Sequence, residues 1–131
     1  MRIRLFAAAL IWCAAMNAAD FTGCPAQVAV SPQRIARAVP GWTPLTAEDA
    51  IHRLASVTFY DGHPSEKASL APDAENRRVQ TWTFAAQSRA YWITCGYSST
   101  TVVLARELGR EVRKCVVRYD GAGAVSSVSC R

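Results

Sequence analysis

Several motifs that mark common enzyme and nucleic-acid-binding classes are missing from this 131-residue sequence. It has no C-x-x-C spacing, which is typical of zinc and redox sites, and no Gly-x-Ser-x-Gly or phosphate-loop motif. It contains only two histidines, His52 and His63, and neither lies near Cys95, Cys115 or Cys130. No block of five or six like charges occurs, which argues against nucleic-acid binding. We therefore predict no cofactor, no metal site and no enzymatic activity.

A hydrophobic run long enough to span a membrane is also missing. The apolar stretch Leu5–Met16 has twelve residues, whereas a spanning helix needs about twenty. Arg2 and Arg4 precede it, and small residues follow it up to Ala19, an order typical of a secretory signal peptide. We predict that residues 1–19 are cleaved and that the mature protein is periplasmic or secreted.

The rest of the chain, residues 20–131, has the length of one small domain. Lipidation of Cys24 is the rival fate, but seven residues, including the charged Asp20, separate that cysteine from the end of the apolar run. Membrane anchoring is therefore not expected. The formal net charge of +5 falls to +3 when Arg2 and Arg4 leave, and the remaining charges are scattered along the chain.

Four cysteines remain after cleavage: Cys24, Cys95, Cys115 and Cys130. In a short exported chain, four cysteines predict two disulfides, for which three pairings are possible. We favour Cys95–Cys115 together with Cys24–Cys130. The first two cysteines lie in strand-like runs that a short connection separates, and the other two lie near the ends of the domain, which often meet.

Alternation of residue character predicts most of the secondary structure as strand. The runs that show it are 27–30, 57–60, 79–84, 91–97, 111–120 and 124–130. Residues 61–78 are polar and proline-containing, which predicts a long surface loop.

Two segments instead carry weak helix signals. Thr46 and Asp49 resemble a capping box ahead of Ala50, Ile51 and Leu54. After Thr101, Leu104 and Leu108 are spaced i,i+4 before Gly109. The expected fold class is α+β to mainly β: a small antiparallel meander of four or five strands with one or two short helices and two disulfides.

A set of landmarks spread along the mature chain resembles a family of short exported proteins of Gram-negative bacteria whose function is uncharacterised. The landmarks are Cys24-Pro25, Gly41-Trp42, Phe59-Tyr60-Asp61-Gly62 with Pro64, Leu70-x-Pro72, Trp82, Trp92-x-x-Cys95-x-Tyr97, Thr100, Cys115 and Cys130. The resemblance implies a periplasmic protein with two disulfides and implies no activity. A fainter similarity of size and compartment links the chain to periplasmic lysozyme inhibitors, although it lacks their Ser-Gly-x-x-Tyr-type loop.

These features favour a binding or inhibitor-like module that contacts an unknown protein partner in the cell envelope. The contact residues proposed from sequence are Trp92, Arg77, Arg78 and His63, because aromatic and arginine side chains dominate interface energetics. Trp92 is the preferred surface tryptophan, since the alternation of the strand places it on the face opposite Cys95. The alternatives are a structural or secretion-accessory envelope protein and, less favoured, a small hydrolase that uses the His52/Asp49 or His63/Asp61 neighbours.

Overall fold

The computed structural model describes residues 23–31, 37–44 and 49–131. The predicted signal peptide and the predicted helix cap at Thr46 lie outside these residues. The described chain is mainly strand, and its one helix is a single 3-10 turn, η1 (Pro64–Glu66). No helix in these ranges is long and apolar enough to cross a membrane.

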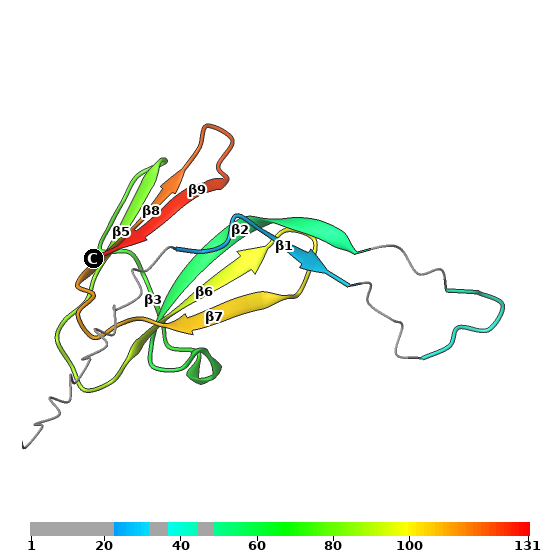
Figure 1. Cartoon of the computed structure of the whole chain (residues 1–131), viewed down its shortest axis with the longest axis horizontal. Helices are drawn as coiled ribbons and strands as arrows, with labels where there is room; N and C mark the ends of the chain where they lie inside the picture. Colours follow the sequence, from blue (N-terminus) through cyan, green and yellow to red (C-terminus); the bar gives the residue numbers. More distant parts are fainter. Residues whose placement is uncertain (1–22, 32–36, 45–48) are drawn as a thin grey trace, which may run out of the picture.

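Nine strands in the described residues form two antiparallel sheets (Figure 1). The first sheet has the order β1-β2-β6-β7, with β3 paired to β2, and the second has the order β4-β5-β8-β9. The strand bounds are β1 (Gln27–Val30), β2 (Ala50–Asp61), β3 (Ser69–Leu70), β4 (Ala74–Glu75), β5 (Val79–Thr83), β6 (Tyr91–Tyr97), β7 (Val103–Glu107), β8 (Lys114–Tyr119) and β9 (Val125–Cys130).

The core lies between the two sheets and is built around Phe59 of β2, which has no exposed surface. Its ring centroid is 4.7 Å from that of Trp82 and 5.6 Å from that of Phe84, both contributed by the segment that contains β5. The Trp82 indole N–H donates to the carbonyl of Leu70 at 3.0 Å, which satisfies its polar atom inside the core. Ile93, Cys115 and Val117 complete the buried centre.

The mainly-β, antiparallel expectation is confirmed, and two predicted strands have the predicted bounds, 27–30 and 91–97. The predicted number of strands was too low. Part of the difference comes from the predicted loop 61–78, which contains η1 and the two-residue strands β3 and β4. Strands this short carry too few residues for alternation to be visible in the sequence.

Neither predicted α-helix is present in the described residues. Ala50, Ile51 and Leu54 instead belong to the twelve-residue β2, whose first half pairs with β1 and whose second half pairs with β6. Val103–Glu107 forms β7, which pairs with β6. Inter-strand hydrogen bonding therefore overrides the weak local helix signals at both places.

The structure contains two disulfides, but their pairing differs from the favoured one. Cys24 is bonded to Cys95, with the Cα atoms 5.8 Å apart, and Cys115 is bonded to Cys130. The expectation failed because β6 and β8 belong to different sheets, so Cys95 and Cys115 are not on neighbouring strands. Cys115 and Cys130 face each other directly in the β8–β9 register.

Candidate interaction surfaces

His63 and Trp92, two of the residues proposed from sequence, lie together at one end of the first sheet. His63 follows the end of β2 and caps η1: its Nδ1 accepts from the Ser65 amide at 3.2 Å, and its own amide donates to Glu66 at 3.2 Å. The His63 ring meets the half-buried Trp92 ring edge-on, with 4.7 Å between centroids. The cap and the ring contact together fix the orientation of this aromatic pair.

An arginine holds the turn beneath this pair. The guanidinium of Arg89 binds the Glu66 carboxylate at 2.5 Å and donates to the carbonyl of Asp61 at 3.2 Å. Gly62 has φ +92°, and a Cβ at that position would lie 1.9 Å from the guanidinium, so this packing requires glycine. The hydrogen bond from Arg89 lowers the pKa of Glu66, which favours the ionised carboxylate near neutral pH.

Arg77 and Arg78 belong to a different surface. Both are exposed and lie in the turn between β4 and β5, where the Asn76 side chain accepts from the amides of Arg78 and Val79 at 2.8 and 2.9 Å. The Arg78 guanidinium lies beside Gly121 in the β8–β9 turn. Figure 1 shows that turn and η1 at opposite edges of the molecule. The four contact residues proposed from sequence are therefore divided between two surfaces.

Among the described residues, the most exposed tryptophan is Trp42 rather than Trp92. Trp82 is in the core, whereas Trp42 is 79% exposed. Its amide donates to the Val39 carbonyl at 3.1 Å across Pro40 and Gly41, and Gly41 has φ +80°. These features are typical of a type II turn. The Pro-Gly pair before Trp42 is the sequence signal for this turn, because Pro-Gly pairs are typical of turns at the protein surface.

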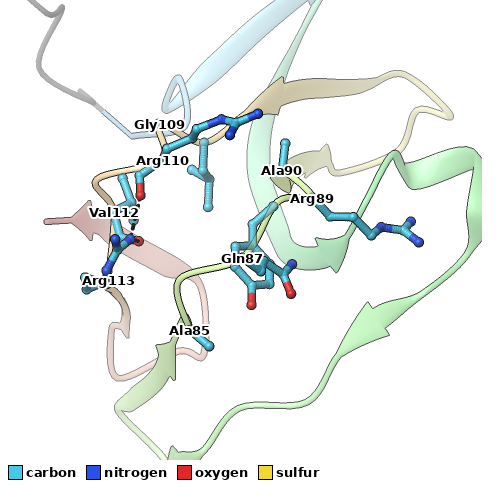
Figure 2. Close-up of a pocket in the computed structure, with 10 residues that line it drawn as sticks. Ala85, Gln87, Arg89, Ala90, Gly109, Arg110, Val112 and Arg113 are labelled. Carbon is cyan, nitrogen blue, oxygen red and sulfur yellow. Dashed lines mark hydrogen bonds between the residues drawn. The ribbon is translucent and has the colours of Figure 1, made fainter.

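Among the hollows that the described residues line, three have distinct positions. Figure 2 shows the first, about 10 Å³, between the connection that leads from β5 to β6 and the connection that leads from β7 to β8. It has room for about one water molecule. The second, about 380 Å³, lies beside the Cys24–Cys95 disulfide, where Ile93 and Leu104 line an apolar depression. The third, about 260 Å³, lies on β8 and β9 between Lys114, Arg118 and Arg131.

Residues 47–131 match the family described as Type VI secretion system Tli immunity protein. The chain belongs to this family. It is also 33% identical over 108 residues to an uncharacterized 16.3 kDa protein in the trpG 5′ region of Azospirillum brasilense, an alignment that covers 74% of this chain and 70% of that protein. No solved structure matches.

The part of the chain that matches the family runs from just before β2 to just after the end of β9. It therefore includes the His63–Trp92 pair, Arg77 and Arg78, and the hollow on β8 and β9. Cys24, β1 and the Trp42 turn precede the matched residues, so the Cys24–Cys95 disulfide joins the segment before the match to its central strand.

A serine–histidine contact occurs in the described residues but lacks the rest of a catalytic arrangement. Ser65 Oγ lies 2.8 Å from His63 Nδ1, but this contact belongs to the η1 cap, and no carboxylate among the described residues is hydrogen-bonded to the His63 ring. His52 Nδ1 lies 2.6 Å from the Ser98 carbonyl. No group of three or more His, Cys, Asp or Glu side chains in the described ranges is placed to hold a metal.

Proposed function

We propose that this chain is a periplasmic immunity protein, which protects its own cell by binding a toxin delivered through a type VI secretion system and blocking it by protein–protein contact. The observation that carries the proposal is the match of residues 47–131 to the immunity family. Two disulfides in a small domain support an oxidising compartment such as the periplasm, and so does the signal-peptide pattern in residues 1–19.

Inhibition by contact also suits the physical character of the domain. Two disulfides and an aromatic core join short strands into a framework that loses little conformational entropy when a partner binds. Candidate contact points are the exposed Trp42 and the His63–Trp92 pair, because tryptophan is enriched among residues that dominate binding energy. Arg77 and Arg78 remain candidates on a separate surface.

A competition experiment between sister strains tests this function. The gene is deleted from a recipient strain, which is then mixed with its type VI-active parent, and recipient survival is counted. We expect the recipient to be killed by the active parent, to survive a parent whose secretion system is inactivated, and to be rescued by the full-length chain.

The same experiment tests the compartment. A chain that lacks residues 1–19 should fail to rescue the recipient, because it stays in the cytoplasm, where the disulfides do not persist. Equal survival of the deletion strain and its parent would contradict an immunity role and would favour a structural or secretion-accessory function. Rescue by the leaderless chain would contradict periplasmic action.

A further inference from the structure

The outer surface of the second sheet carries an unbalanced group of cations. Lys114, Val116 and Arg118 alternate along β8 with Cys115 and Val117, which are fully buried, so the three point away from the core. Across the ladder, Lys114 faces Arg131: their amides and carbonyls exchange hydrogen bonds at 2.9 and 3.0 Å. We call Lys114, Arg118 and Arg131 the basic face.

No carboxylate side chain among the described residues forms an ion pair with the basic face. Directly opposed like charges such as Lys114 and Arg131 are unfavourable in a sheet. The cross-strand neighbours of Val116 and Arg118 on β9 are Ser129 and Ser127, which carry hydroxyls where carboxylates would give ion pairs. None of the three cationic side chains has a hydrogen bond or ion pair with another described residue. The arrangement therefore leaves its counter-charge to come from outside the domain.

One acidic side chain lies next to the strand partner of Lys114. On β5, Thr83 pairs with Lys114, and both its amide and its hydroxyl donate to the Asp73 carboxylate at 2.6 Å. These hydrogen bonds lower the pKa of Asp73 and hold its carboxylate against Thr83, where it forms no ion pair with Lys114.

The shape of the basic face suits a protruding acidic group. The three cations surround a depression of about 260 Å³ whose floor includes Val116 and Ser129. Lys114 and Arg118 are four positions apart, which on a strand corresponds to about 13 Å. A loop or strand that carries two or three carboxylates at such spacing can meet all three cations at once.

We infer that the basic face is the docking surface for an acidic patch of the toxin, an inference that rests on the proposed immunity function. A protein partner suits this surface better than a bilayer, because interfacial membrane binding needs exposed apolar side chains beside the cations. The exposed large apolar residues lie elsewhere: Val39, Trp42, Ile51, Val103 and Leu104. Charge complementarity of this kind mainly speeds association and makes it salt-dependent.

Charge reversal with a matched control tests the inference in the survival assay. The test variant is Lys114→Glu/Arg118→Glu, and the control is Arg53→Glu/Arg110→Glu, which changes net charge equally at two exposed arginines off this face. We expect the test variant to lose most of the rescue and the control to retain it. The melting temperature of each variant checks folding, and Lys114→Glu should not lower it, because it places a carboxylate opposite Arg131.

Binding measurements distinguish an acidic protein from an anionic lipid surface as the partner of the basic face. The toxin is the secreted protein whose deletion from the attacker abolishes killing. We expect its association with the mature protein, purified after export of the full-length chain, to slow at least tenfold for the test variant at low salt and to change little for the control. Vesicles containing 30% phosphatidylglycerol serve as the lipid probe, and we expect no binding to them. Vesicle binding that disappears in the test variant would overturn the protein-partner inference in favour of a lipid surface.

The outcomes separate the two proposals. If the unaltered chain gives no rescue, the immunity function is wrong, and the docking inference fails with it. If the unaltered chain rescues and the test variant rescues equally well, the function stands and the inference about the basic face is overturned. Equal loss of rescue in the test and control variants would likewise overturn it, because net charge and not this surface would then be responsible.

Discussion

The two disulfides have different structural roles in the two sheets. Cys115–Cys130 joins residues that the β8–β9 register already places opposite each other, within a separation of 15 residues. Cys24–Cys95 spans 71 residues and ties a segment that precedes β1 to β6, in the middle of the first sheet. The first bond reinforces a pairing that hydrogen bonds already make, whereas the second creates a connection.

The segment around Cys24 shows what that connection achieves. On one side the Tyr97 hydroxyl of β6 donates to the carbonyl of Pro25 at 3.0 Å. On the other, Gly23 packs so closely against β9 that a Cβ would lie 2.7 Å from the Val128 carbonyl oxygen, and its φ is +83°. Residues 23–25 therefore contact both sheets. A small two-sheet domain whose core is modest gains cohesion from such a tie.

The largest expected effect comes from the core that both sheets share. Phe59→Ala should lower the free energy of unfolding by about 3–5 kcal/mol, because the ring is fully buried against Trp82 and Phe84. Tyr60→Phe, at the next position on the opposite side of β2, should change it by less than about 0.5 kcal/mol. Urea unfolding measures both. A small effect of Phe59→Ala would mean that the sheets are not joined through this ring.

Removing each disulfide tests the comparison directly. The loop-entropy model gives about 4 kcal/mol for the 71-residue loop and about 3 kcal/mol for the 15-residue loop. Cys24→Ala and Cys130→Ala are matched, because each removes the half-buried partner of its bond. We expect the Cys24 variant to be the less stable in chemical denaturation. The reverse order would show that the cross-strand bond, not the bond that ties both sheets, holds the domain together.

Tryptophans in the core and on the surface should separate stability from binding. Trp42→Ala should leave the unfolding free energy within about 0.5 kcal/mol, because the ring is 79% exposed. If Trp42 anchors the toxin, the same change should weaken binding by about 2 kcal/mol, roughly thirtyfold in Kd. Trp82→Ala is the control. Because Trp82 lies in the core, this change should lower the free energy of unfolding. Unchanged affinity for Trp42→Ala would remove this turn from the contact surface.

The smallest expected effect is acid sensitivity at the two carboxylates whose pKa is lowered. Arg89 lowers the pKa of Glu66, in η1 beside the first sheet, from 4.5, and Thr83 lowers that of Asp73, just before β4 of the second sheet, from 3.8. A lowered pKa stabilises the fold above the ordinary value, and the contribution is lost as pH falls through the lowered one. Glu66→Gln and Asp73→Asn should each flatten the stability profile slightly below pH 5. An unchanged profile in either variant would contradict its pairing.

Parts of this fold were predictable because they depend on local pattern. Alternation between Tyr91 and Tyr97 predicted β6 with its observed bounds, and four cysteines in an exported chain predicted two disulfides. Alternation works where a strand is long enough to show one buried and one open face. It fails for β3 and β4, which have two residues each.

The candidate surfaces were only partly accessible to the same reasoning. His63 and Trp92 were proposed separately and meet in the structure, but Arg77 and Arg78 lie on another surface. The basic face was missed because Lys114 and Arg118 come from one strand and Arg131 follows another. Charges that are scattered in sequence gather only when β8 and β9 pair.

The sequence by itself determined the export pattern, the strand-rich character and the number of disulfides, because each depends on residue type and short-range periodicity. Only the tertiary structure decided which cysteines bond, that Leu104 lies in a strand, and that Trp42 is the most exposed of the tryptophans in the described residues. These outcomes depend on which strands become neighbours and which side chains the core covers, and those are relations between residues far apart in the chain.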